Sequence, residues 1–355
     1  MQQGFWAKLQ KPIFALAPMA NVTDAAFRRI IAKYSRPAGP AVFWTEFVSV
    51  EGLLSRGREK LLPDFWFTEA ERPIVAQIFG GKPEQFYEVA KLIVSLGFDG
   101  IDINMGCPDK GVEKSGGGAA LIKNPKLAQK VILETKRGIA DASASGRSSI
   151  PVSVKTRLGY NKDEIETWLP ALFETGLAAL TIHLRTRKEM SLVPAHWEWA
   201  SRAVALRDKY GPETLLLGNG DIPNLTVGRQ LSADHGLDGV MLGRAIFGNP
   251  WLFAEKIPTT EEKLSVCVEH TKLFEELYGA GTVQSVIPKP RDLTPRIKPF
   301  DLMKKHFKAY VSGFSAGGGS ASGGDGGALK VLRMKMMEAE TAQEIEKIVA
   351  NFFKK

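Results

Sequence analysis

The residues best suited to chemistry in this sequence surround a cysteine, in the segment Asn104-Met105-Gly106-Cys107-Pro108. A short apolar run precedes the segment, so we expect the thiol on a loop at the end of a buried strand. A thiol in such a place can donate a proton to a substrate, and it stays protonated at neutral pH unless its pKa is lowered. The other cysteine, Cys267, falls on the apolar stripe of a predicted helix and is expected to be structural. Neither a disulfide nor a metal site is indicated.

Short apolar runs must position this segment. They are typical of strands buried on both faces, and they span Ile13–Ala17, Val42–Phe47, Ile74–Phe79, Gly100–Asn104, Val152–Arg157, Ala179–Leu184, Leu215–Gly218 and Gly239–Leu242. Helical patterns such as Pro83–Leu96 and Pro125–Gly138 lie between them. Eight strands alternating with helices predict an α/β fold, a (β/α)8 TIM barrel. An open doubly wound sheet is the alternative, but no glycine fingerprint follows the first run.

In a parallel barrel, functional residues gather on the loops at the carboxyl ends of the strands. The candidates in these places are Pro18, Met19, Gln77, Asn104, Lys155, His183, Asn219, Gly220, Asp221, Gly243 and Arg244. The ends of the last two strands often hold a phosphate, where glycines permit close approach and Arg244 can bind an anion. Lys155 and His183 are placed to contact a flavin, whose reduced form is stabilised by a nearby cation.

The last hundred residues have a different pattern. Apolar residues recur at helical spacing over 261–278, 300–314 and 345–352, which predicts a helical bundle. We therefore divide the chain into a barrel domain, residues 1–256, and a helical domain, residues 257–355. The glycine- and serine-rich stretch 315–327 is predicted to be a flexible loop.

Basic residues are concentrated between Lys289 and Lys308. The side chains of Lys304, Lys305 and Lys308 lie off the apolar stripe of their predicted helix, and Lys298 precedes it. These four lysines are candidates for RNA phosphate binding, and a solvated helix face is the alternative.

Composition sets wide limits on function. The 355 residues are 44% hydrophobic and carry a net charge of +8, which permits an RNA partner but equally suits a basic enzyme with small substrates. No run of about 18 apolar residues and no secretion signal is found, so we expect neither a membrane span nor export. A cytoplasmic monomer is the simplest expectation.

Seven segments between residues 16 and 251 together resemble the tRNA-dihydrouridine synthase family. In chain order they are LAPMANVTDAAFR, VAQIFG, DINMGCP, PVSVKTRLG, LTIHLRTR, GNGDI and DGVMLGRAIFGNPW. The helical tail also resembles the family's C-terminal tRNA-binding domain. Single segments such as GNGDI are weak signals, but the ordered set is specific.

The resemblance implies FMN at the barrel mouth, NADPH as the reductant and tRNA as the substrate. It implies FMN contacts from the side chains of Gln77, Lys155, His183, Asn219 and Arg244, and from the backbone around Pro18–Met19, Gly220 and Gly243. Reduced flavin would pass a hydride to C6 of uracil, and Cys107 would supply the proton to C5. Arg185 and Arg187, in the HLRTR segment, are predicted to contact flavin or RNA.

The loop over residues 110–120 departs from the family pattern, because Ala119 stands where many members have serine. Two other functions are weighed against the resemblance. A flavin barrel that acts on a free pyrimidine or another small molecule would not need the helical tail and its basic linker. A non-enzymatic RNA-binding protein on a decayed barrel would not need the intact set of Cys107, Lys155, His183 and Arg244.

Overall fold

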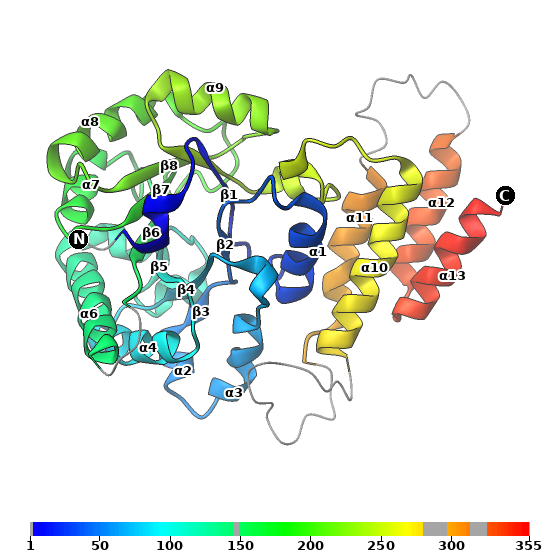
Figure 1. Cartoon of the computed structure of the whole chain (residues 1–355), viewed down its shortest axis with the longest axis horizontal. Helices are drawn as coiled ribbons and strands as arrows, with labels where there is room; N and C mark the ends of the chain where they lie inside the picture. The colour runs from blue at the N-terminus through cyan, green and yellow to red at the C-terminus, as the bar shows by residue number, and fades with distance from the viewer. Residues whose placement is uncertain (1–2, 145–148, 280–296, 313–324, 355) are drawn as a thin grey trace.

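The computed structural model describes residues 3–144, 149–279, 297–312 and 325–354. Its core is a ring of parallel strands (Figure 1): β1 (Ile13–Leu16), β2 (Phe43–Trp44), β4 (Ile74–Phe79), β5 (Gly100–Met105), β6 (Val152–Arg157), β7 (Ala179–His183), β8 (Leu215–Asn219) and β9 (Gly239–Leu242). Strand β9 pairs with β1, and a bridge between Ala15 and Val42 links β1 to β2 and closes the ring. The predicted (β/α)8 barrel is confirmed.

The second strand differs from its prediction. Instead of one strand over Val42–Phe47, β2 is followed by a separate strand, β3 (Val48–Ser49), and both pair with β4. At the break, the Gln77 N–H donates to the Thr45 hydroxyl oxygen at 3.1 Å rather than to a backbone carbonyl. A side chain thus replaces one rung of the ladder, and the chain leaves the sheet between the two short strands.

Helices cover the outside of the strands. The longer ones are α1 (Ala25–Ser35), α4 (Pro83–Ser95), α6 (Pro125–Ser143), α7 (Ile165–Phe173), α8 (Ala200–Tyr210) and α9 (Leu225–His235), and the short ones are α2 (Val50–Leu53), α3 (Arg58–Leu61) and α5 (Lys110–Lys114). The prediction that the helix from Pro125 ends at Gly138 is wrong. Gly138 lies inside α6, which continues to Ser143. Glycine is required at this position because α4 passes so close that a Cβ would lie 2.3 Å from the Tyr87 carbonyl oxygen.

The interior of the barrel changes character along its axis. Alternate residues of each strand point inward, and towards the amino ends of the strands the inward residues are apolar and buried, including Ile13, Val42, Trp44 and Leu215. Trp6, from the short 3-10 helix Gly4–Lys8, packs among them, with its ring centroid 5.9 Å from that of Trp44. The interior is therefore filled at this end, and the polar residues lie at the other.

The C-terminal helices lie side by side on the α1 side of the barrel (Figure 1). They are α10 (Thr260–Tyr278), α11 (Lys304–Ser312), α12 (Asp325–Glu338) and α13 (Ala342–Phe353), and a 3-10 helix, Phe300–Met303, precedes α11. The predicted helical tail is present. Residues 315–324 of the glycine-rich stretch lie outside the described residues, but α12 includes Asp325, so the last three residues assigned to the loop are helical.

The barrel and the C-terminal helices are closely packed against each other. The Ala25 N–H donates to the Tyr278 hydroxyl at 3.0 Å, and the rings of Trp66 and Tyr278 stack with centroids 5.8 Å apart. A Cβ on Gly248 would lie 2.3 Å from the Ala309 carbonyl oxygen, so backbone meets backbone there. The division at residue 256 stays a prediction.

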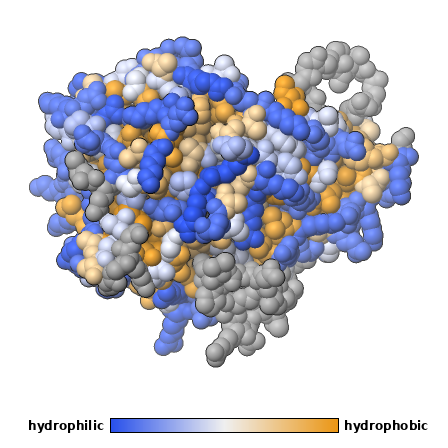
Figure 2. All heavy atoms as spheres, in the orientation of Figure 1, coloured by the Kyte–Doolittle hydropathy of each residue, from blue (hydrophilic) through white to orange (hydrophobic). Residues whose placement is uncertain are grey.

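Hydrophilic residues predominate on the face drawn in Figure 2, with hydrophobic ones interspersed. Within the described part of the chain, every helix is too short or too polar to cross a bilayer.

Candidate active site

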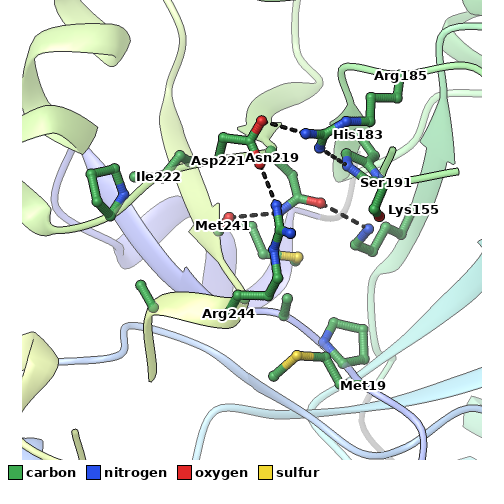
Figure 3. Close-up of a pocket in the computed structure, with 16 residues that line it drawn as sticks. Met19, Lys155, His183, Arg185, Ser191, Asn219, Asp221, Ile222, Met241 and Arg244 are labelled. Carbon is green, nitrogen blue, oxygen red and sulfur yellow. Dashed lines mark hydrogen bonds and ion pairs between the residues drawn. The ribbon is translucent and has the colours of Figure 1, made fainter. Parts of the chain in front are cut away.

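A cavity of about 560 Å³ opens at the carboxyl ends of β1 and β6–β9 (Figure 3). This volume falls within the range of roughly 300–1,000 Å³ that is usual for cofactor and substrate sites. Of the predicted cofactor-binding residues, the cavity is lined by Pro18, Met19, Lys155, His183, Asn219, Gly220, Asp221, Gly243 and Arg244. Arg185 lines it as well, together with Ser191 and Met241, which the sequence did not single out.

Lys155 is held at the cavity wall by an amide. Its ammonium Nζ donates to Asn219 Oδ1 at 3.1 Å, and Asn219 Nδ2 donates to the Met241 carbonyl at 2.7 Å, which fixes the orientation of the amide. Burial, together with the positive charge of Arg157, lowers the pKa of Lys155 to about 8. The Lys155 ammonium at the cavity wall therefore has a neutral hydrogen-bond partner instead of a carboxylate.

His183 is a neutral imidazole in this surrounding. Burial, helped by the nearby charges of Lys155 and Arg157, holds its pKa well below the ordinary value. The Arg185 guanidinium approaches His183 Nε2 at 3.0 Å. Because arginine only donates hydrogen bonds, Nε2 must be the acceptor, and the proton of the ring is then on Nδ1.

Asp221 joins the two arginines of the cavity. Its carboxylate accepts from the guanidinium groups of Arg185 and Arg244, and from the Ala195 N–H at 2.9 Å. Burial alone would raise the pKa of Asp221, but the Ala195 N–H and Arg185 outweigh it and lower that pKa. The Arg185 side chain is only 2% exposed, whereas that of Arg244 is 66% exposed. Arg244 is thus the guanidinium that an incoming anion can reach.

Gly220 and Gly243, the two glycines of the predicted phosphate site, differ in whether the surrounding chain leaves room for a side chain. Gly220 has φ +130°, and a Cβ there would come within 2.8 Å of the Ala195 side chain, so the chain itself demands glycine. A Cβ on Gly243 would meet only Ala17 and Met19, at ordinary contact distances of 3.6 and 3.8 Å. The space beside Gly243 is therefore available to a ligand.

Cys107 lies outside this lining, on the loop that follows β5, and its side chain is partly exposed. Its N–H donates to Asn104 Oδ1 at 2.9 Å, and its carbonyl accepts from the Ala119 N–H at 3.0 Å. Burial raises the pKa of the thiol. The proton that acid catalysis needs is thus present at neutral pH.

Gln77 and Asn104 are placed differently from the other candidates. Both side chains are buried beneath the mouth and do not line the cavity. Asn104 Nδ2 donates to Gln77 Oε1 at 3.1 Å, and Gln77 Nε2 donates to Asp102 Oδ2 at 2.6 Å. Sequence reasoning missed Asp102, although its position two residues before Asn104 puts it on the same inward face of β5.

Two arginines flank the Cys107 loop. Arg157, which the sequence analysis did not assign to the site, is buried and donates through Nε to the Gly106 carbonyl at 2.7 Å. Burial lowers the pKa of Arg157 to about 10. Arg187, predicted to contact flavin or RNA, forms an ion pair with Glu113 of α5, in which Nε and Oε1 are 2.9 Å apart. Its pairing ties the loop after β7 to the residues that follow Cys107.

The four lysines assigned to RNA fall into two groups. Lys304 pairs with Asp301 at 2.6 Å, Lys305 donates to the Asn21 carbonyl, and Lys308 is exposed on the same helix. Lys298 requires a correction, because it is buried between Glu46 and Asp64, with its ammonium 2.7 Å from Asp64 Oδ1. A phosphate cannot reach it there. Among the described residues, no cluster of three or more histidine, cysteine or acidic side chains is arranged to hold a metal.

A search of solved structures finds the same fold. Histamine dehydrogenase from Rhizobium sp. 4-9 superposes with a TM-score of 0.50 and 12% identity, covering 74% of this chain and 49% of that one. At this identity the likeness concerns the fold alone.

Sequence comparison is more specific. The chain is 43% identical over 318 residues to the "Probable tRNA-dihydrouridine synthase" of Staphylococcus aureus (strain COL), with 88% of both chains covered. It is 39% identical to the "Probable tRNA-dihydrouridine synthase 2" of Bacillus subtilis (strain 168), over 100% of this chain and 98% of the relative. The family model described as Dihydrouridine synthase (Dus) matches residues 15–319. This chain therefore belongs to the dihydrouridine synthase family of oxidoreductases.

Proposed function

We propose that this enzyme reduces particular uridines of tRNA to 5,6-dihydrouridine, with FMN as its bound cofactor and NADPH as its reductant. The observation that carries the proposal is one juxtaposition. A cavity rich in cations opens at the barrel mouth, and a thiol that keeps its proton lies on the loop of a neighbouring strand. Family membership supports the substrate, and the choice of NADPH rests on the family resemblance alone.

The cavity residues fit FMN. Arg244 and the open space beside Gly243 suit a terminal phosphate, since an exposed guanidinium binds phosphate oxygens well. Lys155 and the Nδ1–H of His183 are donors for the ring system and the ribityl chain. When bound, FMN supplies the hydride that reaches C6 of uracil.

Cys107 acts on the uracil base, to which it donates a proton. Its raised pKa keeps the proton on Sγ until C5 of uracil needs it. The nearby charge of Arg157 favours the thiolate that remains after transfer. Asn104 holds the Cys107 N–H, which fixes the backbone from which the thiol projects.

The C-terminal helices would hold the tRNA. Lys304, Lys305 and Lys308 lie on α11, outside its buried face. Phosphate contacts of this kind position an RNA without reading its sequence. We further propose that the protein acts in the cytoplasm as a monomer.

The test separates the two half-reactions in the variant Cys107→Ala. Its flavin content and its reduction by NADPH should match the parent. Reoxidation by tRNA should slow by roughly 100-fold or more, the usual contribution of a placed general acid. Stopped-flow absorbance of the flavin follows both steps, and Cys267→Ala is the matched control, because that thiol is buried in α10.

Parent-like reoxidation of Cys107→Ala would assign the acid to another residue. Reoxidation of the parent by free uridine as readily as by tRNA would replace the proposed substrate with a small pyrimidine.

A further inference from the structure

A continuous chain of side-chain hydrogen bonds runs from the middle of the barrel to the Cys107 loop. Ser153 Oγ donates to Asp102 Oδ1 at 2.6 Å, and Gln77 Nε2 donates to Asp102 Oδ2 at 2.6 Å. Asn104 Nδ2 then donates to Gln77 Oε1 at 3.1 Å. Asn104 Oδ1 completes the chain by accepting the N–H of Cys107 at 2.9 Å.

The strands place these groups side by side. Gln77 of β4, Asp102 of β5 and Ser153 of β6 are partners in the sheet register, so they form one layer of the interior. Asn104 stands one layer nearer the mouth, opposite Lys155. The four side chains of this hydrogen-bond chain are all buried. Their orientation must therefore be set by one another rather than by bulk water.

The Asp102 carboxylate at the start of this hydrogen-bond chain fixes which group donates and which accepts at every later step. Asp102 accepts hydrogen bonds but cannot donate while it is ionised, so Gln77 must turn its amino group towards it. Gln77 then offers only its oxygen to Asn104, which must in turn present its own amino group. The Asn104 oxygen is left facing the backbone N–H groups of Gly106 and Cys107. A reversed Asn104 amide would bring its NH2 against these two donors.

Burial raises the pKa of Asp102 to about 6, so at neutral pH the residue is mainly a carboxylate and both of its oxygens accept hydrogen bonds. The Asp102 side chain does not line the cavity. Its hydrogen bonds reach the Cys107 loop through Gln77 and Asn104, and its charge also acts on Lys155 through space.

We infer that Asp102 is a positioning residue that orients Gln77 and Asn104 and thereby holds the turn that presents the Cys107 thiol. The inference rests on the proposed function in so far as Cys107 is the acid of the reaction.

Three substitutions of Asp102 separate the loss of the hydrogen-bond acceptor from the loss of the charge and from a general loss of folding. Asp102→Leu keeps a similar shape but removes the acceptor, and Asp102→Ala does the same without added bulk should the leucine variant fail to fold. Asp102→Asn loses the charge but can still accept from Gln77, with its amino group turned to Ser153. Ser153→Ala is the matched control, since it removes a donor and leaves Asp102 as the acceptor for Gln77.

The first readout is the pair of half-reactions. Asp102→Leu and Asp102→Ala should be reduced by NADPH at the parent rate, whereas their reoxidation by tRNA should slow by roughly 10- to 100-fold, as for a misplaced reacting group. Asp102→Asn and Ser153→Ala should stay within about threefold of the parent, because both variants keep an acceptor for the Gln77 amino group.

The second readout needs neither tRNA nor turnover. Iodoacetamide should alkylate Cys107 in the native protein but not Cys267, whose side chain is 0% exposed. Loss of the acceptor should change the rate of Cys107 alkylation several-fold and leave Cys267 unlabelled. General loosening of the fold would instead label both thiols and would overturn the positioning role.

Two further results would refute the inference. One is a folded Asp102→Leu or Asp102→Ala variant with parent rates of both alkylation and reoxidation. The other is Asp102→Asn with the same defect as Asp102→Leu, which would mean that charge rather than direction matters. If Cys107→Ala keeps full activity while alkylation still responds to Asp102, the proposed function fails and the positioning of the loop stands.

Discussion

Lys298 and Lys155 are both strongly desolvated, and their surroundings are opposite. Lys298, where the C-terminal helices meet the barrel, lies between the carboxylates of Glu46 and Asp64. Burial alone would lower its pKa, but the two carboxylates outweigh burial and raise that pKa well above the ordinary value. Lys155, at the barrel mouth, donates to the neutral amide of Asn219, and burial lowers its pKa to about 8.

The difference separates a cation whose charge is balanced within the fold from a cation that, under the proposed function, binds FMN. The charge of Lys298 is fully compensated by the chain itself. The cavity, by contrast, brings Lys155, Arg185 and Arg244 together around one lining carboxylate, that of Asp221. A bound anion such as the phosphate of FMN would supply the negative charge that this lining lacks. Substitution of each lysine tests one side of this comparison.

The largest effect is expected from Lys298→Met. Loss of the ammonium leaves the buried Glu46 carboxylate beside the partly exposed Asp64 without compensation, which should lower the free energy of unfolding by about 3–5 kcal/mol. Urea denaturation measures the change. In the control Lys33→Met, the broken ion pair with Glu269 is largely exposed, and the loss should be below about 1 kcal/mol. Equal losses in both variants would remove the distinction.

Lys155→Met should have the opposite profile. Its stability should change little, whereas the affinity of the apoprotein for FMN should fall roughly 10- to 100-fold, because a charge-assisted hydrogen bond is lost. In the parent, Lys155 is charged below about pH 8, so FMN affinity should decrease as the pH rises through that value. Fluorescence titration of FMN between pH 6.5 and 9.5 would show the decrease. A variant that retains it would assign the pH dependence to another group.

The smallest effect is expected at the surface of α11. Changing Lys304, Lys305 and Lys308 together to Ala should weaken tRNA binding only several-fold and reduce its salt dependence, because each lost phosphate contact removes one released counterion. FMN should remain bound. The control is Lys272→Ala, a lysine of α10 that pairs with Glu346. Binding curves at two salt concentrations that match the parent would show that the basic face is only solvated.

The barrel could be predicted from the sequence because its strands are buried on both faces and their apolar runs are nearly continuous. Two local details could not be. The hydroxyl of Thr45 replaces a backbone partner in the second strand, and the close approach of Tyr87 explains a glycine in the middle of α6. Both depend on contacts between elements, which no local pattern records.

The same limit applies to the site. Strand ends identified most of the cavity lining, since parallel strands bring their carboxyl ends to one mouth. The role of Lys298 was misjudged because its partner Glu46 is 252 residues away in the chain. Asp102 had a readable signal, an acidic residue inside an apolar strand that needs hydrogen-bond donors when buried. The direction of its hydrogen-bond chain required the structure.

Trp6 has a kinetic consequence. Because its indole packs among the apolar residues inside the barrel at the amino ends of the strands, the candidate site, as far as the described residues show, opens at the opposite end. A nicotinamide dinucleotide and a folded tRNA would both have to approach a flavin in this cavity from that end. Under the proposed function, the oxidised dinucleotide must leave before the nucleic acid enters, so the enzyme should alternate between its two partners in a ping-pong cycle rather than gather them in a ternary complex.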